Sequence, residues 1–404
     1  MRHAGRNTLK AHGSAMPAAA NRPGAFPARP AAGAAAGSTA FAAGDGANAP
    51  HTVAAPPGSS APAFAARGSW GASIRRRLLG IPLAEASVAR RGFVVRDPRV
   101  GERLEAIGST FIGGYHAALE SRDESDLAAR LEETEAERRG FAFEGAAMGL
   151  LLLDALTPWA RGRWRRFADG PGAHHIYMVH VGAGWALARL PGGFRRSWLP
   201  FDPLLSWLAY DGYGFHEGYF HRESRVIERA VPASLEGYAL RAFDQGLGRS
   251  LWFGEGADPM RIAAAISAFA PQRRADLWGG AGLAAAYAGG VSSATLESLR
   301  NLAGAFAPHV AQGAAFAAKA RERAANPAPH TALACRVLCG IEAGEAARLT
   351  DDALEALPGD GATPAFETWR ARVRERLARA TADGRTRPAA RDEAGGSVHA
   401  RGAH

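Results

Sequence analysis

AYDGYGFHEGYFH, residues 209–221, combines a G-x-G pattern with the densest group of titratable and aromatic side chains in the sequence. A looser form of the pattern, G-x-[GA] followed by a hydrophobic residue, recurs on both sides of it. The first glycines of the copies are Gly145, Gly182, Gly212, Gly246, Gly280 and Gly313, so successive copies lie 37, 30, 34, 34 and 33 residues apart. This spacing is the basis of the fold prediction.

A period near 34 residues is the length of one helix–turn–helix hairpin in stacked repeat proteins of the tetratricopeptide type. Most copies run into sequence rich in alanine and leucine, which favours helix. A helical glycine costs about 1 kcal/mol relative to alanine, so its recurrence indicates that two helices approach closely at each copy. The alternative is chance, because the chain contains 49 glycines. We predict an all-α fold, a stacked array of helical hairpins with a period of about 34 residues.

Composition divides the chain into three parts. Residues 1–68 are rich in Ala, Gly, Pro and Ser without a periodic apolar pattern, which predicts a disordered arm. Residues 69–381 are expected to form a single helical-repeat domain, and the polar residues 382–404 a disordered tail. Within the domain, IYMVHV at 176–181 is the one longer stretch with the alternation of a strand.

The positive charge of the chain lies in its first part. Residues 1–100 hold 13 Lys and Arg against three acidic residues, a net charge of +10. The rest of the chain holds 35 Lys and Arg against 36 acidic residues. A basic arm can contact nucleic acid or an anionic membrane, but such a run is more often a solvated tail. Residues 277–296 carry no charge, yet their glycines, serines and threonine favour a packed helix pair over a membrane span. We expect a soluble cytoplasmic protein that binds no nucleic acid and does not span a membrane.

The candidate catalytic residues cluster on the glycine motifs. Carboxylates and imidazoles together can perform acid–base chemistry or hold a metal. Equivalent positions of stacked repeats line one face, so these side chains would share a groove that also includes Asp244 and His221. The candidates are Asp211, His216, Glu217, Glu144 and His180. The alternative for the carboxylates Glu144, Asp211 and Asp244 is a structural role, as caps of helix N-termini or in hydrogen bonds.

HEGYFH at 216–221 resembles a zinc-protease helix only superficially. That motif places its two histidines four residues apart on one helical face, with the glutamate next to the first. Here the spacing is five, which turns His221 about 140° away from His216 on a regular helix. A zinc site of that type is therefore not predicted, although one of these histidines with His180 and a carboxylate remains an alternative. Cys335 and Cys339 are expected to be free buried thiols. The sequence assigns no cofactor.

Six motifs, taken together and in order, resemble an uncharacterised bacterial family whose members occur in enediyne polyketide biosynthesis cassettes. The resemblance covers roughly residues 74–360 and leaves out the arm. It implies an accessory role beside an iterative polyketide synthase, in the conversion of a linear polyene towards an enediyne core, and it carries over no catalytic residues. The motifs are RRRLLGIPLAEASVARRGF (75–93), RRGFAFEGAAMGLLLLDALTPW (138–159), HIYMVHVGAGWALARL (175–190), DPLLSWLAYDGYGFHEGYF (202–220), FDQGLGRSLWF (243–253) and RRADLWGGAGLAAAYAGG (273–290).

Two functions from different classes follow. In the first, the protein binds or processes a long apolar polyene in a groove whose reacting end carries the histidines and carboxylates. The aromatic side chains expected to line this groove are Trp185, Tyr210, Tyr213, Phe215, Tyr219 and Phe220. In the second, the chain is a non-catalytic repeat scaffold that docks a synthase, another cassette protein or a membrane partner. A paired His216 and Asp211 at the bottom of an apolar pocket would favour the first.

Overall fold

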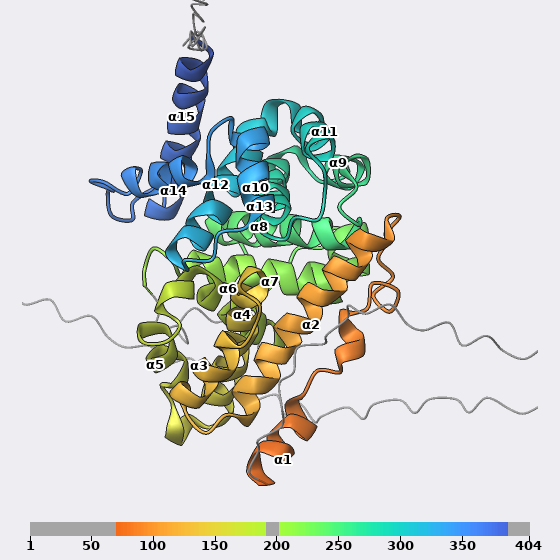
Figure 1. The fold of residues 1–404 in the computed structure, drawn as a ribbon, viewed down its shortest axis with the longest axis vertical. Helices are drawn as coiled ribbons and strands as arrows, with labels where there is room; N and C mark the ends of the chain where they lie inside the picture. Colours follow the sequence, from red (N-terminus) through yellow and green to blue (C-terminus); the bar gives the residue numbers. More distant parts are fainter. Residues whose placement is uncertain (1–69, 191–201, 387–404) are drawn as a thin grey trace, which may run out of the picture. The chain divides into compact units, whose positions relative to one another are not determined.

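A computed structural model describes residues 70–190 and 202–386, and within these residues the regular elements are all helices (Figure 1). The described residues belong to one compact unit. The predicted all-α class is confirmed. The arm predicted for residues 1–68 lies outside the described residues, and so does most of the predicted tail. The last helix continues to Thr386, beyond the expected domain end at residue 381.

Seven helices carry the six glycine motifs and a related IGGY sequence at 112–115. We call these seven helices the core stack. They are α2 (Pro98–Glu120), α4 (Ala136–Leu156), α6 (Ile176–Arg189), α7 (Trp207–Phe220), α8 (Gly237–Gly254), α10 (Pro271–Tyr287) and α12 (Ala307–Arg323).

The other helices surround or join these seven. They are α1 (Trp70–Leu79), α3 (Glu124–Glu132), α5 (Arg163–Asp169), α9 (Pro259–Ser267), α11 (Ser293–Ala303), α13 (Pro329–Ala334), α14 (Ala343–Asp352) and α15 (Ala365–Thr386). Short 3₁₀ turns are η1 (Leu83–Ala86), η2 (Pro158–Ala160), η3 (Ala173–His175) and η6 (Gly304–Phe306), and single π-helical turns are η5 (Glu223–Ile227) and η7 (Cys335–Cys339).

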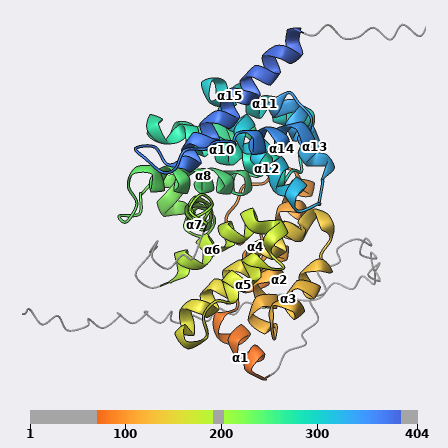
Figure 2. The same ribbon diagram turned by 90° about the vertical axis from the view of Figure 1, so that its left-hand side faces the viewer.

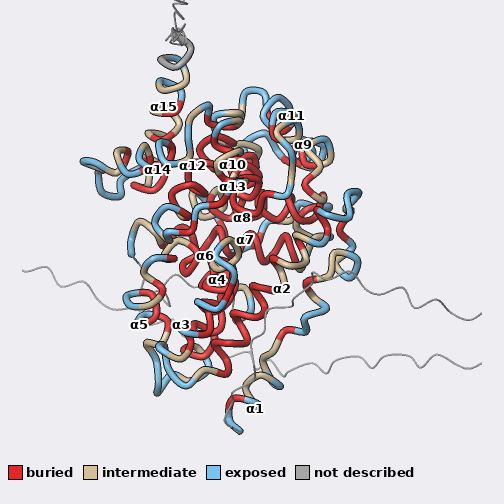
Figure 3. The backbone as a smooth tube through the Cα atoms, in the orientation of Figure 1, coloured by how far each residue is buried: buried red, intermediate tan, exposed pale blue. Residues whose placement is uncertain are grey.

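Each helix of the core stack packs against the preceding and the following one in chain order. Figures 1 and 2 show α4, α6, α7, α8 and α10 following one another through the molecule. The shorter helices α9 and α11 connect core helices without separating them. Buried segments concentrate on the core stack, whereas exposed segments gather on the outer connections (Figure 3).

The two glycines of a motif face opposite neighbours. A Cβ atom on Gly246 would overlap the carbonyl oxygen of Asp211 in α7, and one on Gly248 would overlap that of Leu277 in α10. Only a residue without a side chain lets two helix backbones approach this closely. The same alternation holds for Gly182 and Gly184 in α6, Gly212 and Gly214 in α7, and Gly280 and Gly282 in α10. The close approach that the recurring glycines indicate is therefore a property of the core stack.

IYMVHV, the stretch with strand-like alternation, forms the first part of α6. The capping role that was one alternative for the carboxylates is wrong. The glycine motifs lie inside the helices, so Glu144, Asp211 and Asp244 occupy interior positions of α4, α7 and α8 and cannot cap helix N-termini. The helices begin at other residues: Asp258, for example, accepts hydrogen bonds from the amides of Met260 (3.0 Å) and Arg261 (3.2 Å) at the start of α9.

Within the described residues, length and apolar composition do not qualify any one helix as a bilayer span. By the same two criteria, α4 and the following residues Pro158–Asp169 qualify as a possible span only when they are taken together, and the two segments are bent by 118° relative to each other.

Candidate functional site

The centre of the core stack holds a buried ionic cluster of Asp211, Gln245 and Arg249. Asp211 comes from α7, and Gln245 and Arg249 lie one turn apart on α8. The guanidinium NH1 of Arg249 donates to Asp211 Oδ1 at 2.5 Å, and the Gln245 amide donates to Asp211 Oδ2 at 2.8 Å. All three side chains are buried. Both oxygens of Asp211 are thus engaged, which makes it the counter-ion of Arg249 and leaves it poorly placed to act as a free base.

Glu144 is the buried carboxyl group that is least satisfied by its neighbours. Its Oε1 accepts a hydrogen bond from the indole Nε1 of Trp185 at 3.0 Å, whereas its buried Oε2 has no hydrogen-bond partner. Burial raises the pKa of Glu144 to about 7. The positive charge of Arg249 partly opposes this increase, and the negative charge of Asp211 adds to it. A carboxyl group with a pKa near neutrality can both donate and accept a proton, which is what acid–base catalysis requires.

Glu144 lies in the wall of an apolar cavity that we call the Trp185 cavity. Its volume is about 30 Å³, room for about two water molecules. Packed aromatic rings form much of its wall: Trp185, for example, lies 5.0 Å from Phe215 in an edge-to-face arrangement. The lining includes Phe111, Phe141, Glu144, Trp185, Phe215, Tyr219 and Phe220.

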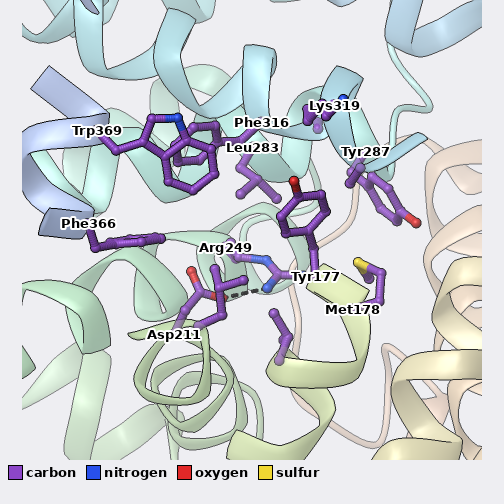
Figure 4. Close-up of a pocket in the computed structure, with 14 residues that line it drawn as sticks. Tyr177, Met178, Asp211, Arg249, Leu283, Tyr287, Phe316, Lys319, Phe366 and Trp369 are labelled. Carbon is purple, nitrogen blue, oxygen red and sulfur yellow. Dashed lines mark hydrogen bonds and ion pairs between the residues drawn. The ribbon is translucent and has the colours of Figure 1, made fainter. Parts of the chain in front are cut away.

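A second apolar cavity, the Trp369 cavity, has a volume of about 40 Å³. Figure 4 shows Asp211 and Arg249, joined by their ion pair, in its wall, with Phe366 and Trp369 contributed by α15. The guanidinium carbon of Arg249 also lies 4.7 Å from the ring centre of Phe215, which lines the Trp185 cavity. Arg249 therefore lies in the wall of the Trp369 cavity and contacts one wall residue of the Trp185 cavity.

Not all of the predicted aromatic residues gather at one place. Trp185, Phe215, Tyr219 and Phe220 line the Trp185 cavity. Tyr210 instead packs against Trp207, with ring centres 5.5 Å apart, and Tyr213 packs against Phe243 at 5.3 Å.

Asp244 also lies apart from the Trp185 cavity. Both of its oxygens accept from Arg273, at 2.5 and 2.8 Å, and burial raises its pKa to about 6. The sequence prediction that Asp244 is a substrate-binding residue stays a prediction, and its ion pair with Arg273 fits the structural role that the sequence left open as the alternative.

The pairing of His216 with Asp211, which would have favoured polyene processing over the scaffold, is not formed. His216 places its Nδ1 3.3 Å from Glu217 Oε1, whereas Asp211 binds Gln245 and Arg249. Five residues of helix separate the two side chains, which turns them about 140° apart around α7. His180 is elsewhere again: its Nδ1 lies 2.8 Å from the carbonyl oxygen of Ile176, beside a surface depression of about 410 Å³. The single groove expected for these residues is thus divided among several places.

The structure brings His221 close to His216, with ring centres 5.7 Å apart, contrary to the extrapolation from a regular helix. The reason is that α7 ends at Phe220, and His221 leaves the helix with φ −121° and ψ 41°. Its Nδ1 then lies 3.0 Å from Glu217 Oε1. Burial alone would raise the pKa of Glu217, but hydrogen bonds from His216 and Arg225 lower it to about 2. Burial lowers the pKa of His216.

Sequence reasoning missed Arg249 and the residues of α15. Arg249 is the residue that breaks the hydrophobic slot of its own glycine motif, and this anomaly is the signal that could have identified it. Phe366 and Trp369 lie far along the chain from the glycine motifs, and only the packing of α15 brings them to Asp211.

A family model described as protein of unknown function (DUF1702) matches residues 70–377. The chain belongs to this family. The DUF1702 match includes every helix of the core stack and ends inside α15, so both cavities and the ionic cluster lie within it. No curated protein and no solved structure matches the chain. For this DUF1702 protein, function has to be inferred from the chemistry of the site.

Proposed function

We propose that this DUF1702 protein is an accessory biosynthetic protein that binds a long apolar polyene in the Trp185 cavity. It would act in the cytoplasm beside an iterative polyketide synthase, on the way to an enediyne-type natural product. The observation that carries the binding proposal is Glu144, a protonatable carboxyl group with one unpartnered oxygen, in a wall formed mainly by aromatic and isoleucine side chains that also includes Glu85. The biosynthetic setting is supported by the resemblance of the six sequence motifs, and the 34-residue spacing supports a repeat array of hairpins.

A conjugated chain suits this cavity better than a branched or polar ligand. Such a chain is thin, flat and apolar, and aromatic rings interact favourably with other π systems in offset or edge-to-face arrangements. A cavity of about 30 Å³ does not hold a polyene without widening. The rings of Phe215, Tyr219 and Phe220 would rotate or shift to admit it, and a slender chain demands the smallest shift.

Glu144 would supply the chemistry at the cavity wall. Below a pH of about 7 its carboxyl group is neutral and holds a proton, and above that pH it can accept one. The hydrogen bond from Trp185 to Oε1 fixes the orientation of the group, and Oε2, which has no hydrogen-bond partner, would reach the ligand once the cavity widens. A single proton exchanged at Oε2 is within the capacity of this site, and it is the chemistry that we assign to it.

The test is binding of cis-parinaric acid, a conjugated tetraene that accepts energy from excited tryptophan, to the full chain. Trp185→Phe removes the indole of the proposed cavity, and Trp369→Phe is its matched control in the other cavity. We expect saturable quenching of tryptophan emission, reduced by Trp185→Phe and little changed by Trp369→Phe. No saturable binding, or a greater loss with Trp369→Phe, would contradict polyene binding in the Trp185 cavity.

A second candidate function, a scaffold without chemistry, is favoured by helix α1. Trp70 and Leu78 on this helix are 84% and 76% exposed, so both large apolar side chains are accessible to a partner. The same parinaric acid titration separates the two functions. A chain that binds no polyene but forms a complex with its synthase, lost on Trp70→Ser, would support the scaffold.

A further inference from the structure

Three potential metal ligands meet where α7 ends. Oε1 of Glu217 lies 3.3 Å from Nδ1 of His216 and 3.0 Å from Nδ1 of His221. One ligand atom from each of the three residues falls within 4.8 Å of the others. We propose that His216, Glu217 and His221 form a binding site for a divalent transition-metal ion. This site is independent of the function proposed for the Trp185 cavity.

The donor set suits such an ion. Two imidazoles and one carboxylate, with further positions left for water, are found in catalytic zinc sites and in non-haem iron sites. Zinc binds nitrogen and carboxylate oxygen at about 2.0–2.2 Å, so two ligands of one ion lie at most about 4 Å apart. The three side chains therefore need to shift by less than about 1 Å to reach a common ion.

The surroundings of the three ligands are those of a built site. Nε of Arg225 donates to Oε2 of Glu217 at 2.8 Å, which orients the carboxylate and leaves Oε1 for the ion. Ligating carboxylates in metal sites are commonly held in this way. The side chain of His216 is only 3% exposed, and its Nε2 has no hydrogen-bond partner, so neighbouring groups do not fully satisfy the ring. His221, at 55% exposed, gives the ion a route from solvent.

The rival explanation is that Glu217 simply accepts hydrogen bonds from both imidazoles and from Arg225. It has one point in its favour, because the positive charges of Arg225 and the nearby Arg189 oppose a cation. Against it, both imidazoles present Nδ1 to the same oxygen, Oε1 of Glu217, while Arg225 holds Oε2, which is the convergence that a shared ion requires. The two explanations differ in what His221 does: it is a ligand in the first and a replaceable surface donor in the second.

The site adjoins the Trp185 cavity. The ring of His216 lies 5.6 Å from that of Trp185 and 4.9 Å from that of Phe220, and both of these residues line the cavity. An ion at this place would be one aromatic ring away from a ligand in the cavity.

The experiment uses the full chain without a histidine tag, stripped with a chelator and dialysed against Zn²⁺, followed by metal analysis by mass spectrometry. Binding of Co²⁺, followed by its visible absorption, gives a second readout that reports the ligand set. The variants are Glu217→Gln, which keeps the shape of the side chain, and His221→Ala. His174→Ala removes a different exposed histidine and is the matched control. Circular dichroism confirms that each variant is folded.

We expect one equivalent of zinc in the unmodified chain and in His174→Ala. Affinity should fall by about tenfold or more in Glu217→Gln and His221→Ala, since even the loss of an outer hydrogen-bond partner costs 10–100-fold. The Co²⁺ absorption should disappear in the same two variants. An unmodified chain that binds no zinc, or zinc binding that persists unchanged in a folded His221→Ala variant, would overturn the proposal.

Discussion

Asp211 in α7 and Arg249 in α8 form an ion pair at 2.5 Å in the middle of the core stack, with both side chains buried. Removing two charges from water is costly, so a buried ion pair is weak evidence that its role is stability alone. This pair lies in the wall of one apolar cavity and, through Phe215, against the other. Its charges also act on Glu144, the protonatable group of the second cavity. The pair therefore belongs to the electrostatics of the candidate site.

Replacing Asp211 and Arg249 together should destabilise the fold by much less than the sum of the two single replacements. Asp211→Asn leaves Arg249 buried without its counter-ion, and Arg249→Met likewise leaves the Asp211 carboxylate buried without a cation. Breaking a buried pair on one side costs about 3–5 kcal/mol, whereas replacing both partners removes the uncompensated charge. Urea unfolding of the two single variants and the double variant should show a double loss well below the sum of the single losses. Additive losses would mean that the two side chains are not coupled.

Two adjacent glycines in α10 should respond in opposite directions to alanine. A Cβ on Gly280 would overlap the carbonyl oxygen of Gln245, so Gly280→Ala should destabilise the fold by about 1–3 kcal/mol or more. A Cβ on Gly279 would meet Arg370 NH2 at 3.5 Å and His309 O at 3.7 Å, which are ordinary contacts. Gly279→Ala should therefore be neutral or stabilising by up to about 1 kcal/mol through helix propensity. Thermal unfolding of both variants is the measurement, and equal losses would refute the glycine-contact account.

Stability should depend on pH through Glu144. Its pKa is higher in the folded state, about 7, than its ordinary value of 4.5, so the folded chain retains a proton that the unfolded chain has already released. The free energy of unfolding should therefore fall as the pH rises through this window. Relative to Glu144→Gln, the unmodified chain should lose roughly 2–3 kcal/mol between pH 5 and pH 8. Urea unfolding at the two pH values gives the difference. Glu297→Gln, which removes an exposed carboxylate, is the control for loss of one charge.

The two thiols should be unreactive until the chain unfolds. Cys335 and Cys339 are buried in η7, and their Sγ atoms face the carbonyl oxygens of Ala314 (3.8 Å) and Ala311 (3.2 Å) in α12. The hydrogen bond with Cys335, together with burial, raises the pKa of the Cys339 thiol, and the thiolate is the reactive form. With an aromatic disulfide reagent at pH 8, labelling in buffer should be at least about 100-fold slower than in urea. Fast labelling of the folded chain would place η7 at the surface.

The sequence predicts the helical class and the close contacts because both follow from local pattern. Glycine at a regular interval indicates where backbones meet, and the hydrogen bond between Asp211 and Gln245, 34 residues apart, joins equivalent positions of two copies. The helix boundaries do not follow, since the motifs lie within helices and not before them. The approach of His221 to His216 depends on where α7 ends, a boundary that the hydrophobic pattern does not fix. The walls of the Trp369 cavity depend on α15, whose place is set by tertiary packing.

The alternating glycine contacts also order the core stack by exposure to solvent. The backbones of α7 and α8 are covered from two sides by neighbouring helices that carry no side chain at the point of contact, whereas α2 and α12 stand at the ends of the series. Amide hydrogens of α7 and α8 can reach solvent only when two such close contacts open together, whereas α2 and α12 are covered by one such contact and by the side-chain packing of the outer helices. Exchange with deuterium should accordingly be slowest around Gly212 and Gly246 and become faster towards both ends, so the stack is held most firmly where the charges of Asp211 and Arg249 are buried.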